Sequence, residues 1–357
     1  MAHIAMMEHE VVRRRGWLTR EQFLDFVGAA NLLPGPNSTE LALHVGRERG
    51  GWRGLLIAGA AFILPSAILV GALAWVYVRF GSLPELAGVL HGVKPVVIAI
   101  MLQALWRLGR TAVRSPVLAA IALAVAVAAA LGAGELLLLA AAGIVSALAA
   151  ALARRGLRAK PLPLLLLVPG PAAGLAIQGT AAAFSLGTLF VTFLKIGSVL
   201  FGSGYVLLAF LRADFVERLG WLTGQQLLDA VAIGQVTPGP LFTTATFIGF
   251  LLAGVPGAIL ATVAIFLPAF VFVAASGPLI PRIRRSPTAG ALLDGVTVAS
   301  LALMAIVTWQ LGREAIVDLP TLGIAVTAAA ALFASRINSA WLILAGGLLG
   351  AALTYAS

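Results

Sequence analysis

The sequence has no cysteine and few charged residues. Without cysteine, disulfides, iron–sulfur clusters and thiolate metal sites are excluded. Charged residues make up 11% of the 357 positions, about half of the roughly 25% that a soluble domain carries. The histidines His3, His9, His44 and His91 have no metal-ligand spacing, and the sequence contains neither a Walker loop nor a nucleophile elbow. We therefore expect no metal, no cofactor, no enzyme activity and no ATP-driven pump.

Apolar residues make up 61% of the chain, and the mean hydropathy is +1.03. A globule of this size has no room to bury so much apolar surface, so most of it is expected to face lipid. Apolar runs predict nine spans, near residues 54–78, 86–106, 116–133, 135–153, 184–205, 256–277, 290–311, 318–335 and 339–356. The segment 164–183 contains Pro169-Gly170-Pro171 and is a linker, a surface segment or a poor tenth span. This pattern predicts an all-α polytopic membrane protein.

The net charge of +10 is explained by basic residues that gather on one side of the membrane. The predicted spans place fourteen Lys and Arg residues of the first half on one side of the membrane, in stretches 8–22, 47–53, 107–115 and 154–163, and only Arg79 on the other. The positive-inside rule makes the fourteen cytoplasmic. Because no aromatic-interleaved basic stripe accompanies them, the partner they indicate is the lipid bilayer and not a nucleic acid.

The second half of the chain repeats the first at a shift of 204 residues, which falls to 203 after a one-residue gap. Rare residues recur in order: Trp17-Leu18-Thr19 as Trp221-Leu222-Thr223, Pro34-Gly35-Pro36 as Pro238-Gly239-Pro240, and Leu64-Pro65 as Leu267-Pro268. The predicted domains are a first repeat at 1–160, a linker at 161–183 and a second repeat at 184–357.

One confident span, 184–205, separates the halves, so the second repeat is expected to be inverted relative to the first. Inverted repeats are typical of secondary transporters, which bind substrate near the bilayer midplane at the repeat interface. Basic residues of the second half support the inversion only weakly, with four expected inside and three outside.

Each repeat contains a segment interrupted by Pro-Gly-Pro, namely 22–46 with Pro34, Gly35 and Pro36, and 226–250 with Pro238, Gly239 and Pro240. Each arm of about ten residues is too short to cross a core of ~30 Å at 1.5 Å per residue. We therefore predict two re-entrant helix pairs, because broken backbone is tolerated at membrane depth only where protein or a wet cavity surrounds it.

The helix that starts after each break points its free N–H groups and positive dipole end inward, where they attract anions. Asn37, Ser38 and Thr39 follow the first break, and Thr243 and Thr244 follow the second. These short side chains either donate to a bound oxyanion or only cap buried helix starts.

Further polar residues lie within apolar sequence. Three of them are basic: Lys195, His91 and Lys94. Each either pairs with a functional partner inside the membrane or lies near a span end and extends its charged group to the membrane surface. Three acids are candidates to carry protons or to pair with these cations: Asp25, Glu40 and Asp229. For Asp25 and Asp229, a purely structural role is the alternative. Gln235 precedes the second break by one turn and is placed to hydrogen-bond a substrate. Gly202, Ser203 and Gly204 permit close helix approach or an anion-binding backbone nest.

Several motifs together resemble the bidomain bacterial chromate transporter family. They are Asn31-Leu32-Leu33-Pro34-Gly35-Pro36-Asn37-Ser38-Thr39, Phe62-Ile63-Leu64-Pro65-Ser66, His91-Gly92-Val93-Lys94-Pro95, Phe201-Gly202-Ser203-Gly204, Gln235-Val236-Thr237-Pro238-Gly239-Pro240 and Phe266-Leu267-Pro268. The resemblance covers nearly the whole chain. It implies a carrier of the inner membrane, driven by protons or the membrane potential, that exports chromate and confers chromate resistance.

Only the resemblance supplies chromate, a tetrahedral dianion shaped like sulfate. A carrier of the same fold for sulfate or another anion is the first alternative, and a membrane-embedded enzyme or structural subunit is the second. The Gly346-x-x-x-Gly350 pair is either a homodimer face or a close contact within one chain.

The span 184–204 has no counterpart in the first repeat, because Met1 aligns with Tyr205. The opening span of the first repeat, including the partner of Phe201-Gly202-Ser203-Gly204, is therefore expected upstream of Met1. We expect a misassigned start codon or a fragment.

Overall fold

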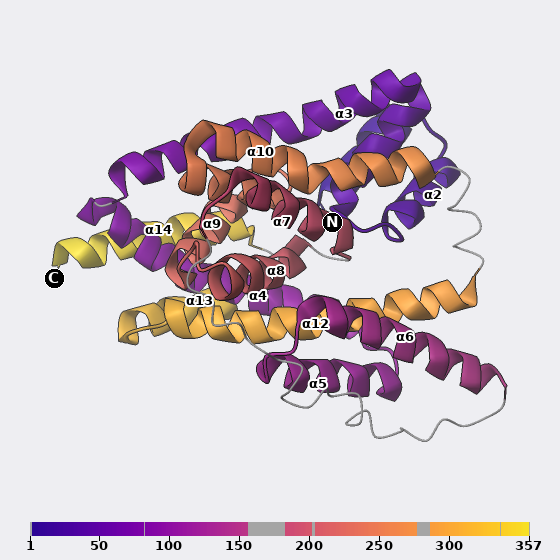
Figure 1. The fold of residues 1–357 in the computed structure, drawn as a ribbon. Coiled ribbons are helices and arrows are strands. Elements are labelled where there is room, and N and C mark those ends of the chain that lie inside the picture. Colours follow the sequence, from indigo (N-terminus) through magenta and orange to yellow (C-terminus); the bar gives the residue numbers. More distant parts are fainter. Residues whose placement is uncertain are drawn as a thin grey trace. The chain divides into compact units, whose positions relative to one another are not determined.

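The computed structural model describes residues 2–81, 83–155, 183–201, 204–276, 286–335 and 337–356. Within these ranges the regular structure is helical and contains no strand (Figure 1), which confirms the predicted all-α class. The helices are α1 (Ala2–Glu8), η1 (His9–Arg14), α2 (Arg20–Ala30), α3 (Asn37–Phe80), α4 (Pro84–Ala112), α5 (Pro116–Ala130), α6 (Glu135–Arg154), α7 (Leu186–Val199), η4 (Gly204–Val206), α8 (Leu207–Leu211), η5 (Arg212–Arg218), α9 (Gly224–Val236), η6 (Leu241–Thr243), α10 (Thr244–Ser276), α12 (Pro287–Ala315), α13 (Leu319–Ala334) and α14 (Ser339–Ala356).

Each of the nine predicted spans falls on a helix. In the described part of the chain, α3, α4, α6, α10 and α12 are long and apolar enough to cross a membrane, and α5, α7, α13 and α14 are shorter apolar helices. The predicted span 184–205 extends too far, because α7 ends at Val199. Leu200 leaves the helical conformation, and its carbonyl accepts the N–H of Gly35 at 2.7 Å. Residues 161–182 of the predicted linker lie outside the described part of the chain.

The chain divides into two compact units, and each unit contains segments of both sequence repeats. Unit 1 comprises Met1–Gly71, Ser185–Gly204 and Thr237–Pro287, and unit 2 comprises Ala72–Phe184, Tyr205–Val236 and Thr288–Ser357. Both Pro-Gly-Pro turns belong to unit 1, whereas α9, the arm that precedes the second turn, belongs to unit 2.

Matching positions of the two repeats have matching backbone conformations. Thr19 and Thr223 each accept the N–H of the glutamine three residues later, whose side chain accepts the threonine N–H in return, as in a capping box. Gly51 and Gly254 interrupt α3 and α10 at φ of 58° and 62°. Only glycine adopts this region without strain, so the glycine at the matching position of each repeat permits the bend there. Inversion of the second repeat stays a prediction.

Glycines allow α4 and α14 to pack closely in unit 2. A Cβ on Gly92 would overlap the carbonyl oxygen of Gly346 and lie 2.7 Å from the nitrogen of Gly350. The Gly346-x-x-x-Gly350 face thus packs against α4 of the same chain, which is the second of the two roles considered for this motif.

We expect Gly92→Ala to lower the stability of the protein by roughly 1–3 kcal/mol, because the added methyl group must push two backbones apart. Gly109→Ala, on the same helix, meets no atom within 4 Å and should be neutral or gain up to about 1 kcal/mol of helix propensity. Thermal unfolding of both variants in detergent checks this. Equal melting temperatures for the two variants would contradict the close α4–α14 packing.

Candidate functional site

The two Pro-Gly-Pro segments, here called break 1 (Pro34, Gly35 and Pro36) and break 2 (Pro238, Gly239 and Pro240), form nearly the same turn. Gly35 has a φ of 142° and Gly239 a φ of 144°, both in the region that favours glycine. The carbonyl of Pro36 accepts the N–H of Thr39, and the carbonyl of Pro240 accepts the N–H of Thr243. A helix starts directly after each turn.

Each break packs against the long helix of the other repeat, beside the proline within that helix. A Cβ on Gly35 would lie 3.6 Å from the Cβ of Ala269, which follows Pro268 in α10. A Cβ on Gly239 would overlap the hydroxyl of Ser66, which follows Pro65 in α3. The absence of a side chain at both glycines permits these contacts.

Ser66 also holds break 2 through a hydrogen bond. Its hydroxyl lies 3.0 Å from the Oγ1 of Thr243, and Thr243 Oγ1 in turn donates to the carbonyl of Pro240 at 2.8 Å. At break 1, the amide of Asn37 donates to Asn31 Oδ1 at 2.6 Å. Side chains predicted to follow the breaks thus also fix the turns.

Several polar atoms after the breaks are buried without a hydrogen-bond partner among the described residues. Thr39, Glu40 and Thr244 are 0% exposed, and their side-chain oxygens have no partner there, nor does Asn37 Oδ1. Buried polar groups in native proteins are almost always hydrogen-bonded, so these atoms need an explanation, for which water or a ligand is the usual one. All four residues were candidates from the sequence.

The remaining unit 1 candidates lie as follows. Ser38 is half-buried at the start of α3, Lys195 is half-buried on α7, and Asp25 is exposed on α2. A Cβ on Gly204 would lie 3.5 Å from the Cβ of Leu241, the first residue after break 2. Gly202 and Ser203 lie outside the described residues.

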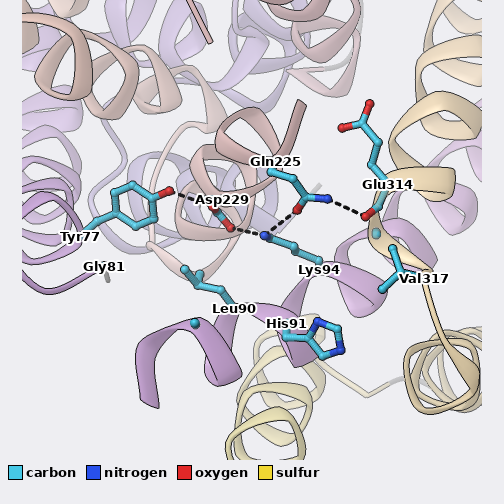
Figure 2. Close-up of a pocket in the computed structure, with 11 residues that line it drawn as sticks. Tyr77, Gly81, Leu90, His91, Lys94, Gln225, Asp229, Glu314 and Val317 are labelled. Atoms are coloured by element: carbon cyan, nitrogen blue, oxygen red, sulfur yellow. Dashed lines mark hydrogen bonds and ion pairs between the residues drawn. The ribbon is translucent and has the colours of Figure 1, made fainter. Parts of the chain in front are cut away.

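In unit 2, Lys94 and Asp229 form a buried ion pair (Figure 2). Lys94 Nζ on α4 lies 3.0 Å from Asp229 Oδ1 on α9, with side-chain exposures of 15% and 7%. Lys94 Nζ also donates to Gln225 Oε1 at 2.7 Å, and the Tyr77 hydroxyl donates to Asp229 Oδ2 at 2.9 Å. The structure thus brings two predicted residues together and adds partners that satisfy both charges.

Charged residues extend this cluster toward the loop between α12 and α13. The amide of Gln225 donates to the carbonyl of Glu314, and the Glu314 carboxylate accepts from Arg212 at 2.8 Å. His91 Nε2 lies 3.3 Å from Asp318 in that loop. Hydrogen bonds from Thr321 lower the pKa of the Asp318 carboxyl, and His91 lowers it further.

A cavity of about 200 Å³ adjoins the cluster, with Tyr77, His91, Lys94, Gln225 and Asp229 among the residues that line it (Figure 2). It has room for several water molecules. Gln235, later on α9, is not among its lining residues, and its buried Nε2 has no hydrogen-bond partner in the described part of the chain.

Sequence analysis did not name as site residues Ser66, which it quoted only within a motif, or Tyr77, Gln225, Arg212 and Glu314. Ser66 had one usable signal, since it follows a proline that both repeats share. For the others, no local pattern shows which distant helix they face, because Tyr77 and Asp229 are 152 positions apart.

Comparisons with known proteins agree on one family. The family model described as "Chromate transporter" matches residues 1–153 and 187–351. The chain is 33% identical over 351 residues to the chromate transport protein of Cupriavidus metallidurans, covering 98% of this chain and 87% of that protein.

Two further relatives have similar names. The probable chromate transport protein of Synechococcus elongatus is 32% identical over 90% of this chain and 82% of its own length. The chromate transport protein of Pseudomonas aeruginosa is 32% identical over 98% of this chain and 87% of its own length. No solved structure matches the chain.

We expect Lys94→Ala to destabilise the protein by about 3–5 kcal/mol, because it leaves the Asp229 carboxylate buried without its cation. The double variant Lys94→Gln/Asp229→Asn should recover most of this loss, since a neutral hydrogen-bonded pair replaces the ions. Arg14→Ala is the control: its side chain is 68% exposed, and removing such a surface pair changes stability by at most about 1 kcal/mol. Thermal unfolding measures all three, and a double variant as unstable as Lys94→Ala would contradict the pairing.

Proposed function

The chain belongs to the chromate transporter family, and on that premise we propose that it is a secondary active transporter that exports chromate across the inner membrane and so confers chromate resistance. It is a multi-pass bacterial membrane protein. In this proposal the two breaks hold the oxyanion, the protein catalyses no reaction, and the membrane potential or a proton gradient drives export.

One observation carries the proposed site: the breaks adopt the same turn, and buried polar side chains without partners among the described residues follow both. Thr39 and Thr244 offer hydroxyl donors there. The helix starts add backbone N–H groups and the positive ends of two dipoles. Such donors suit a tetrahedral oxyanion, whose four oxygens accept from several directions.

The charge of the substrate supports export. Moving one charge across 100 mV is worth about 2.3 kcal/mol, so a dianion gains roughly 4–5 kcal/mol on leaving a cell that is negative inside. That corresponds to a concentration ratio on the order of a thousandfold. The potential alone therefore suffices to drive chromate outward, whereas uptake of the dianion requires another ion.

Sulfate is the main alternative substrate because it has the same shape and charge. The hydroxyl and backbone donors at the breaks recognise an oxyanion by its geometry and not by its central atom. Inhibition of chromate transport by sulfate, molybdate and phosphate, compared in one set of proteoliposomes, ranks the possible substrates.

We expect Thr243→Val to reduce chromate efflux at least tenfold. The substitution keeps the side-chain volume but removes the hydroxyl that bonds to Ser66 and to the Pro240 carbonyl. Thr111→Val is the matched control, since that hydroxyl is exposed and bonds only to carbonyls of its own helix turn. Chromate accumulation is measured in cells that contain equal amounts of each protein in the membrane.

Two results would count against the proposal. Equal efflux in Thr243→Val and Thr111→Val would show that break 2 does not hold the substrate. Equal chromate accumulation with and without the unaltered protein, under an imposed potential, would show that chromate is not transported.

A further inference from the structure

Glu40 is the acidic residue of the first turn of α3, directly after break 1. Its side chain is 0% exposed, and neither carboxyl oxygen has a hydrogen-bond partner among the described residues. A Cβ on Gly35 would lie 2.5 Å from Glu40 Oε1 and 3.3 Å from its Cδ. The carboxyl group therefore fills the space that a side chain at position 35 would take, and it lies against the turn of break 1.

Several helices pack around this turn. Leu41 and Val45 of α3 pack with α1, η1 and α2, Leu43 packs with α10, and the end of α7 bonds to Gly35. The charged and titratable groups on these elements are His3 and Glu8 on α1, His9, Glu10, Arg13 and Arg14 on η1, Arg20, Glu21 and Asp25 on α2, Lys195 on α7, none on α10, and His44 and Arg47 on the next turns of α3. Within the described residues, none of them pairs with Glu40.

The second repeat has no acid at the matching position. At the shift of 204, Glu40 corresponds to Thr244, which is also buried and has no partner among the described residues. The two breaks therefore share a turn but differ by one carboxyl group.

An ionised Glu40 and a dianion repel each other when both lie at the same helix start. The neutral acid removes this repulsion and supplies an O–H donor, which a tetrahedral oxyanion accepts. Proton binding and oxyanion binding thus favour each other at this position, and by linkage each strengthens the other by the same factor.

On the proposed function, we propose that Glu40 is the proton-binding site of the transporter, and that it takes up one proton as the oxyanion binds. The proton comes from solution on the loading side and is returned to solution when the oxyanion leaves. One dianion and one proton therefore move together, with one net negative charge. On this inference the membrane potential and not a proton gradient drives export, with about half the driving force of the bare dianion.

The test is proton uptake by the purified protein in weakly buffered detergent, followed with a pH-sensitive dye while chromate is added. The pH is kept above neutral, where free chromate is the dianion. Uptake should approach one proton per bound oxyanion as the pH rises, and affinity should fall by up to about tenfold per pH unit. Glu40→Gln should bind chromate without proton uptake or pH dependence, whereas Glu48→Gln, an exposed acid on the same helix, should behave as the unaltered protein.

The outcomes separate this inference from the proposed function. Chromate binding by the unaltered protein without proton uptake at any pH would overturn the role of Glu40 and leave chromate transport standing. Failure of the unaltered protein to bind chromate would overturn the proposed function itself. Proton uptake that persists in Glu40→Gln would assign the proton to another group. If Glu40→Gln does not fold, the unaltered protein still tests the inference, because chromate binding without proton uptake overturns it.

Discussion

The structure depends on one constraint: inside a bilayer, every backbone N–H and C=O must find its partner within the protein. A Pro-Gly-Pro turn interrupts the helical hydrogen bonds twice in this chain, and nearby groups supply the missing partners. Leu200 gives up its place in α7 so that its carbonyl receives the Gly35 N–H, and the carbonyls of Pro36 and Pro240 accept from the first turns that follow. Asn37, Thr39, Glu40 and Thr244, which follow the breaks, have buried polar atoms without partners in the described residues, and a ligand can satisfy them there.

The repeat supplies a scaffold with similar backbone geometry in both halves, and single substitutions make it asymmetric. Gly35 and Gly239 differ by only 2° in φ, yet Glu40 corresponds to Thr244. Asp25 and Asp229 match in sequence, but Asp25 is exposed on α2 whereas Asp229 is buried against Lys94. The sequence repeat therefore accounts for the similar turns. The chemical differences between the halves come from individual side chains.

Sequence reasoning predicted the helices and the positions of both breaks, because hydrophobic runs and Pro-Gly-Pro are local signals. It extended α7 too far: the helix ends at Val199, and the carbonyl of the extended Leu200 bonds to Gly35, a contact that is distant in sequence. It named Lys94 and Asp229 as separate candidates, but their pairing and the contribution of Tyr77 depend on which helix faces come together. It did not assign Ser66 to the site, although Ser66 follows a proline that both repeats share, because the sequence does not show that its hydroxyl faces break 2.

The described charges also indicate how such a carrier can release its substrate. A fixed cation in the binding site would hold a dianion tightly on both sides of the membrane, since charge-assisted hydrogen bonds are about twice as strong as neutral ones. Lys94 is neutralised by Asp229, and Arg47 donates to the carbonyl of Val273, whereas the partnerless groups after the breaks include two hydroxyls and one carboxyl. Neutral donors bind an oxyanion by geometry with moderate strength. In the proposed site, a carboxyl group among them would make that strength depend on a proton, and loss of the proton would favour release of the anion.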